Sequence, residues 1–170
     1  VEWLLRVSRG DAPASCPARE FNFSDIQDIL EPIGLALDAG AIGIFRVNPD
    51  PAGAGTISMI YEWGCPAYHS CMFKPELKQF TYGALGISRW RDLLIKGEVI
   101  PAALSTLPED EKRLFSLLGV QSGIILPIFI RDSLWGFIGF FDLVERARSP
   151  DEVEALRITA NLLGAAIGYQ

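Results

Sequence analysis

The sequence predicts an α+β domain, in which antiparallel hairpins form a sheet and helices pack against it. Residues 122–130 and 133–143 are rich in Ile and Phe and flank the polar turn Arg131-Asp132, the strongest hairpin signal in the chain. Residues 41–47 and 56–63 flank a turn rich in Pro and Gly, and they predict a second hairpin. Apolar residues at helical spacing before, between and after these hairpins predict the helices.

Composition excludes several classes of function. The chain has 170 residues, 49% of them hydrophobic, which suits one domain with a substantial core. A net charge of −6 leaves no basic stripe for a phosphate backbone, so we expect no nucleic-acid partner. No apolar run has the length of a membrane span and no export signal is present, so we expect a cytoplasmic domain without membrane contact. Three cysteines without a CxxC pair argue against disulfides and structural zinc.

The amino-terminal part divides into a linker region and the start of the domain. Residues 1–22 predict a short helix and an irregular linker, since a glycine and two prolines stop the helix. The domain proper is expected over residues 23–170. Its first helix, residues 25–37, follows a capping box that starts at Ser24, and it contains Pro32. The chain has no initiator Met, so we expect it to be part of a longer protein.

The middle of the chain is irregular. Residues 64–89 lack clean periodicity and predict a long loop or a short helix around residues 76–80. A short helix is expected after a cap at Ser88, and a short edge strand is expected to end at Pro101.

A helix with an acidic start is predicted next. Leu107-Pro108-Glu109-Asp110-Glu111 places proline and acids in a first turn, where missing donors and the helix dipole favour them, so we assign these acids no chemistry. Gly119 ends this helix. In the last predicted strand, Gly136 and Gly139 indicate that another backbone or a ligand approaches closely.

The last helix, which opens with Ser149-Pro150-Asp151-Glu152, has two apolar faces. A helix that covers a sheet needs only one, so the other face requires a second helix, from this chain or from a partner. One face consists of Val153, Leu156, Ala160, Leu163 and Ile167, and the other of Ile158, Leu162, Ala165 and Tyr169. We predict dimer contacts at the second face and at Leu4, with coverage by the amino-terminal helix alone as the alternative.

Several short motifs occur in the order typical of one known family. They include Ile42-Gly43-Ile44-Phe45-Arg46, Tyr61-Glu62-Trp63, Gly97-Glu98-Val99-Ile100, Leu126-Pro127-Ile128 and Leu134-Trp135-Gly136-Phe137-Ile138-Gly139-Phe140. On these motifs the chain resembles GAF domains, most closely those of bacterial sensor histidine kinases and of cyclic-dinucleotide enzymes such as diguanylate cyclases. The resemblance implies an α+β, PAS-related fold. Its central antiparallel sheet is expected to have five to six strands, with helices on both faces and terminal helices packed together.

The sequence lacks the ligand-binding signatures of two groups of GAF domains, which limits the ligands that we expect. The Asn-Lys-Phe-Asp-Glu signature of cyclic-nucleotide-binding members is absent, and His69-Ser70-Cys71 reverses the Cys-His order of members that attach a bilin. We therefore expect neither a cyclic nucleotide nor a covalent bilin. The sequence identifies no cofactor.

Candidate ligand-binding residues lie in the strands and loops around an expected pocket. The pocket is predicted between the sheet and residues 64–97, with an aromatic lining that stacks on a flat ligand. Ser122 or Arg46 would orient the polar edge of this ligand. The alternative is that the aromatic side chains are ordinary core anchors. The candidate lining consists of Tyr61, Trp63, Tyr82, Trp90 and Trp135, with Trp63 and Trp90 preferred.

A loop histidine and two cysteines offer further chemistry. His69, the only histidine, is a candidate ligand of haem iron or of the bound molecule, and Cys71 is a candidate pocket residue. Cys65 and Cys71 also support an enzymatic alternative, because GAF-fold enzymes that reduce free methionine sulfoxide use loop cysteines. Unreactive, packed cysteines are the simpler interpretation.

Together these observations predict a sensory or regulatory domain of a larger bacterial signal-transduction protein, such as the histidine kinase of a two-component system. We expect it to bind an unidentified small molecule, to form a homodimer and to be linked covalently to an output domain. With one histidine no Ser-His-Asp set is available, and no phosphate-binding glycine loop is present, so we assign no catalytic or metal-binding residues. The alternatives are the reductase activity and a purely structural dimerisation module.

Overall fold

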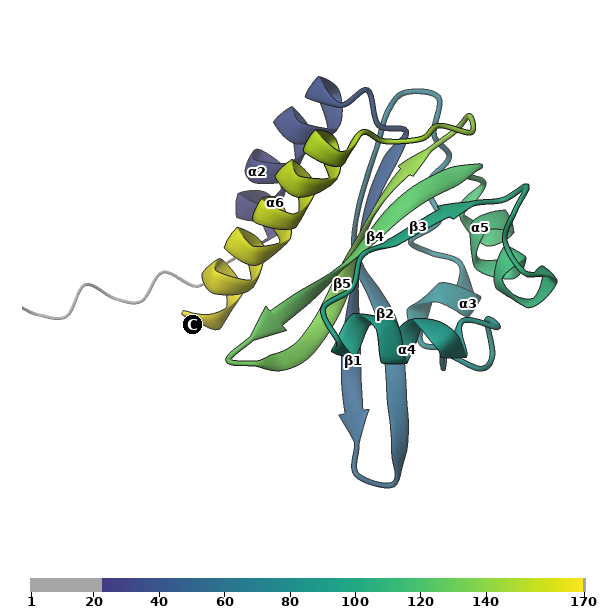
Figure 1. Ribbon diagram of the computed structural model, residues 1–170, viewed down its shortest axis with the longest axis vertical. Coiled ribbons are helices and arrows are strands. Elements are labelled where there is room, and N and C mark those ends of the chain that lie inside the picture. The colour runs from purple at the N-terminus through teal and green to yellow at the C-terminus, as the bar shows by residue number, and fades with distance from the viewer. Residues whose placement is uncertain (1–22, 170) are drawn as a thin grey trace, which may run out of the picture.

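Five antiparallel strands form one sheet in the order β2-β1-β5-β4-β3 (Figure 1). This computed structural model describes residues 23–169, so the predicted amino-terminal helix with Leu4 lies outside the described residues. The α+β class and both predicted hairpins are confirmed. The strands are β1 (Ala41–Asp50), β2 (Gly53–Gly64), β3 (Ile100–Ala103), β4 (Ser122–Ile130) and β5 (Ser133–Asp142).

Helices cover both faces of the sheet, and the strand alternation separates two cores (Figure 1). In β1, Ile42 and Ile44 pack with the helices on one face, whereas Ala41 and Phe45 pack with those on the other. We call the first group the helix-face core and the second the loop-face core. The helix face carries α2 (Phe23–Ala36) and α6 (Pro150–Gly168), and the loop face carries α3 (Pro75–Lys78), α4 (Ser88–Ile95), the 3-10 turn η1 (Glu109–Glu111) and α5 (Lys112–Leu118).

The β4–β5 hairpin turns at the two residues that the sequence indicated. Arg131 and Asp132 have φ angles of 49° and 64°, as a two-residue turn with a left-handed centre requires. A Cβ on Gly136 of β5 would lie 2.1 Å from the carbonyl oxygen of Phe45, because the β1 backbone runs beside it. The predicted close approach of another backbone is therefore confirmed at this glycine.

Two local predictions are wrong. β3 does not end at Pro101, because Pro101 pairs with Ile124 inside the strand. A proline is tolerated there because β3 is an edge strand, where a missing N–H need not remove a ladder bond. Ser88 does not cap α4: the N-cap is Ile87, and no side chain caps this helix.

The last helix, α6, begins and packs as predicted. Ser149 Oγ accepts a hydrogen bond from Glu152 N at 3.2 Å, and the Glu152 carboxylate accepts one from Ser149 N at 3.1 Å. Leu156, Ala160 and Leu163 are buried against the sheet. The other predicted face is exposed: Ile158 is 53% exposed, Leu162 65% and Tyr169 89%.

Candidate functional site

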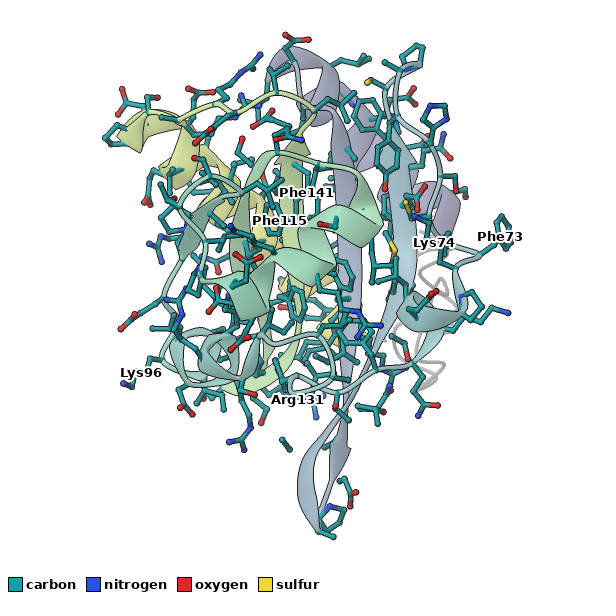
Figure 2. The ribbon with its side chains drawn as sticks, turned by 90° about the vertical axis from the view of Figure 1, so that its right-hand side faces the viewer. Phe73, Lys74, Lys96, Phe115, Arg131 and Phe141 are labelled. Atoms are coloured by element: carbon teal, nitrogen blue, oxygen red, sulfur yellow. The ribbon has the colours of Figure 1, made fainter. Side chains whose placement is uncertain are left out.

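Aromatic rings fill the centre of the loop face, where the sequence predicts a pocket. Trp90 of α4 is fully buried, and its ring meets Phe115 and Phe137 edge-on, each at a centroid distance of 6.4 Å. Phe45 stacks on Phe137 at 4.8 Å, and Phe115 meets Phe141 edge-on at 5.7 Å (Figure 2). These rings occupy the space between the sheet and the helices α4 and α5. The centre of this face is a packed core.

A buried carboxylate anchors the indole of Trp90. Glu111, at the end of η1, is 3% exposed, and its Oε2 accepts a hydrogen bond from Trp90 Nε1 at 3.1 Å. The Arg89 guanidinium donates two more, from Nε at 2.7 Å and from Nη2 at 2.9 Å. Burial alone would raise the pKa of Glu111, but the bonds from Arg89 and Trp90 outweigh it and the pKa is lowered. Glu111 is therefore an ionised acceptor that fixes α4 to η1.

The assignment of all three acids of η1 to the helix dipole is wrong for Glu111. Glu109 is exposed and pairs with Lys112 at 2.9 Å, whereas Glu111 points into the core. The sequence does contain a signal for this difference, because Glu111 shares its helical spacing with buried residues further along the chain. These residues are Leu114, Phe115 and Leu118.

The five aromatic residues predicted to line one pocket lie on opposite faces of the sheet. Tyr82 and Trp90 belong to the loop-face core. Tyr61 belongs to the helix-face core, and Trp63 and Trp135 pack against it. Trp63 and Trp90, the preferred pair, are therefore separated by the sheet and do not face one cavity.

The two polar residues predicted to orient a ligand have other partners. The exposed Arg46 places its guanidinium 5.9 Å from the centre of the Trp135 ring, within the range of a cation–π contact. Ser122 is buried, and its Oγ donates to the Val144 carbonyl at 3.3 Å and accepts from Arg146 N at 2.9 Å. Ser122 thus holds the turn that follows β5.

Two tyrosine hydroxyls are buried and have no hydrogen-bond partner among residues 23–169. They belong to Tyr61, which is 6% exposed, and to Tyr82, which is 3% exposed. Burial raises the pKa of Tyr82 to about 12, against the opposing charge of Arg91. Burial and the charge of Glu31 raise the pKa of Tyr61 to about 12. Both hydroxyls are therefore protonated at neutral pH, and each keeps an unused donor.

The loop that carries Cys71 is tied to the end of α5. Cys71 is 3% exposed, and its Sγ lies 3.2 Å from the Leu117 carbonyl oxygen, to which Lys74 Nζ also donates at 2.5 Å. The Cys71 N–H donates to the Glu62 carboxylate at 2.9 Å. His69 is exposed, and its carbonyl oxygen lies 3.3 Å from Cys71 Sγ. These contacts give Cys71 a packing role.

Cavities open at the edges of the two faces. One of about 450 Å³ lies between the tip of the β1–β2 hairpin and the start of α4, and Tyr82 and Arg91 line it. Another, of about 620 Å³, lies against β3 and the start of α6. Across residues 23–169, no helix has the length and apolar character of a membrane span, and no three potential metal-ligating side chains cluster together.

The family model of the GAF domain matches residues 26–167. The chain belongs to the GAF domain family. A curated relative, the methanogenesis regulatory histidine kinase FilI of Methanothrix harundinacea (strain 6Ac), is 32% identical over 142 residues. That alignment covers 83% of this chain and 16% of the kinase, so the chain spans only a small part of the relative's length.

Solved structures share the GAF fold. The phycocyanobilin-bound GAF domain from a cyanobacterial phytochrome aligns with a TM-score of 0.71 and 20% identity, over 98% of this chain and 90% of that one. GAF3 from Slr1393 of Synechocystis sp. PCC6803 aligns with a TM-score of 0.71 and 18% identity, over 86% and 94% of the two chains. At these identities the likeness shows the fold alone. The predicted family and the predicted sheet with helices on both faces are confirmed.

A buried arginine joins the sheet of this GAF domain to its helix layer, and sequence reasoning missed it. The Arg148 side chain is 4% exposed, and its Nη2 pairs with Asp142 Oδ1 at the end of β5 at 2.5 Å. Its Nη1 donates to Glu152 of α6 at 2.9 Å and to the Leu37 carbonyl, just after α2, at 2.6 Å. One guanidinium therefore links β5 to both terminal helices. Its partner Leu37 lies 111 residues away, so no local pattern indicates this contact.

Proposed function

We propose that this GAF domain is a regulatory input domain of a larger signal-transduction protein and forms a homodimer through the outer face of α6. The observation that carries this proposal is an exposed apolar stripe on a helix whose opposite face already packs on the sheet. The stripe recurs at steps of three or four residues, so its members share one face of the helix. They are Ile158, Leu162, Ala165 and Tyr169.

A second copy of the chain suits this stripe. Large apolar side chains on successive helical turns are rarely left in water as a continuous patch. The other helix of this layer, α2, also has exposed apolar side chains: Leu35 is 63% exposed and Ile29 is 42% exposed. Among the described residues no element covers the outer side of α6 (Figure 1). A twofold axis would pair the stripe with itself and bury it in a bundle of helices.

A linked output domain is supported by the histidine kinase relative. Because the alignment covers 16% of that kinase, most of the relative consists of other segments. Arg148 connects the end of β5 to α6, so a change in the sheet would reach the dimerising helix through a buried ion pair. We infer regulation rather than reductase catalysis, since the Cys71 thiol is buried and held by carbonyl oxygens.

We do not extend the bilins of the related structures to this chain. A ligand at the centre of the loop face would displace the Trp90 ring and leave Glu111 without its bond from the indole. The first change would expose a buried ring, and the second would leave a buried carboxylate without one of its hydrogen bonds, so both are unfavourable. A small molecule is therefore expected at an edge of the domain.

Native mass spectrometry under gentle ionisation tests the dimer. We expect the wild-type chain to be a dimer and Leu162→Glu to be a monomer, because a carboxylate at the centre of the stripe would have to be buried unpaired. Val144→Glu is the matched control, since Val144 is 64% exposed but lies in the turn after β5. A monomeric wild-type chain, or a Leu162→Glu variant as dimeric as the control, would contradict the proposal.

A further inference from the structure

The cavity between the β1–β2 hairpin and α4 has the size and the polar groups of a ligand site. Its volume of about 450 Å³ lies within the range of sites for small molecules. Residues of the hairpin tip line one side of it, and residues of the segment from Thr81 to Asp92 line the other. Neither the family match nor the regulatory role assigns a function to this position.

The Tyr82 hydroxyl is the first feature that points to a ligand. Tyr82 lines the cavity, yet its hydroxyl is buried without a hydrogen-bond partner among the described residues. Leaving a buried donor unpaired is unfavourable, so a ligand acceptor that pairs with it would stabilise the site. The positive charge of Arg91, which lines the same cavity, acts on this hydroxyl.

The Arg91 guanidinium is the second feature. Arg91 lines the same cavity, and its ion pair is a long one, with Nη1 4.0 Å from Oδ1 of the adjacent, exposed Asp92. A charge-assisted bond is about 2.7–2.9 Å long, so no strong acceptor among residues 23–169 occupies this guanidinium. Ser88, the first residue of α4, also lines the cavity, and no side chain caps this helix.

We propose that this cavity binds a small monocarboxylate, which accepts a hydrogen bond from the Tyr82 hydroxyl and pairs with the Arg91 guanidinium. A carboxylate fits because it only accepts hydrogen bonds and because its two oxygens match the planar fork of arginine. A single negative charge is favoured over two, since the carboxylates of Asp50 and Asp92 also line the cavity and repel anions. The inference rests on the proposed regulatory function for its biological meaning, because it names the class of molecule that the domain would sense.

Isothermal titration calorimetry of the 170-residue chain tests this site, with acetate, butyrate and benzoate as probes. We expect saturable binding of at least one probe, and at least tenfold weaker binding of its neutral amide. Tyr82→Phe removes only the unpaired hydroxyl, so the variant should fold at least as well as wild type and bind the probe about tenfold more weakly. Arg91→Gln should show a similar or larger loss. Arg113→Gln, an exposed arginine outside this cavity, should bind like wild type.

Two outcomes would overturn the inference: no saturable binding of any probe, or binding that Tyr82→Phe and Arg91→Gln leave unchanged. Repeating the titration on Leu162→Glu separates this inference from the dimer proposal. Probe binding by a monomeric chain would support the site whatever becomes of the dimer. A wild-type dimer that binds no probe would refute the site and leave the dimer intact.

Discussion

The loop face and the helix face of this GAF domain use their aromatic and aliphatic side chains in opposite ways. On the loop face, Trp90, Phe115 and Phe137 turn inward and pack against each other, with the indole held by Glu111. On the helix face, the inner side of α6 is buried, but Leu162 and Tyr169 on its outer side are exposed. The centre of the loop face is therefore packed from within, whereas the outer side of α6 leaves large apolar side chains exposed.

The contrast between the two faces limits where a ligand could bind in this GAF domain. The fold is shared with a GAF domain solved with phycocyanobilin bound, and in this chain aromatic rings fill the centre of the loop face. In a packed centre, the movement of one side chain forces its neighbours to move as well, because the side chains are in close contact. The two proposals accordingly put ligand binding at the edge of the loop face and dimer contacts on the helix face.

The largest expected effect comes from removing the central ring of the loop face. Trp90→Ala should lower the free energy of unfolding by about 3–5 kcal/mol, because the site is fully enclosed and cannot collapse easily. Urea denaturation followed by circular dichroism measures this loss. Trp135→Ala is the control, since Trp135 is only half-buried on the other face, and it should cost clearly less. Equal losses for the two variants would mean that the loop face is a loosely filled pocket.

A smaller effect is expected from the buried carboxylate. Glu111→Ala leaves Trp90 Nε1 without an acceptor and should cost about 1–3 kcal/mol. Most of this cost comes from the buried indole N–H, because the Arg89 side chain is 53% exposed and its ion pair is screened by solvent.

The same carboxylate predicts a pH dependence. The folded-state pKa of Glu111 is lowered, so its contribution to stability is present above the unfolded pKa of about 4.3 and is lost as pH falls through the folded value. The stability difference between wild type and Glu111→Gln should therefore shrink in acid, below about pH 4. Denaturation at pH 7 and pH 3 measures this difference. A gap that stays constant between these pH values would show that Glu111 is not ionised in the folded protein.

Much of the fold follows from local patterns in the sequence. The β4–β5 hairpin, the capping box at Ser149 and the two faces of α6 depend on neighbours within a few residues, and all three are confirmed. The faces taken by the pocket aromatics could not be predicted in this way. The pairing register between β1 and β2 shifts at Ile44 and Phe45. Because of this irregularity, the alternation of residues along β2 does not reveal which face Tyr61 and Trp63 occupy.

Long-range contacts account for the remaining gaps in the prediction. Arg148 and Glu111 have their roles through partners that the fold brings together, and the cavity beside Tyr82 exists only where the hairpin meets α4. The sequence did indicate Tyr82 as a pocket residue. It did not indicate Arg91, because a charged residue in a short helix has the same pattern as a solvated one.

Thermal unfolding over a hundredfold range of protein concentration tests the central claim most directly. If the outer face of α6 holds two copies together, mass action makes the wild-type Tm rise with concentration, while the Tm of Leu162→Glu stays constant. A wild-type Tm that does not change with concentration would contradict the account, because the apolar stripe of α6 would then have no second copy to cover it.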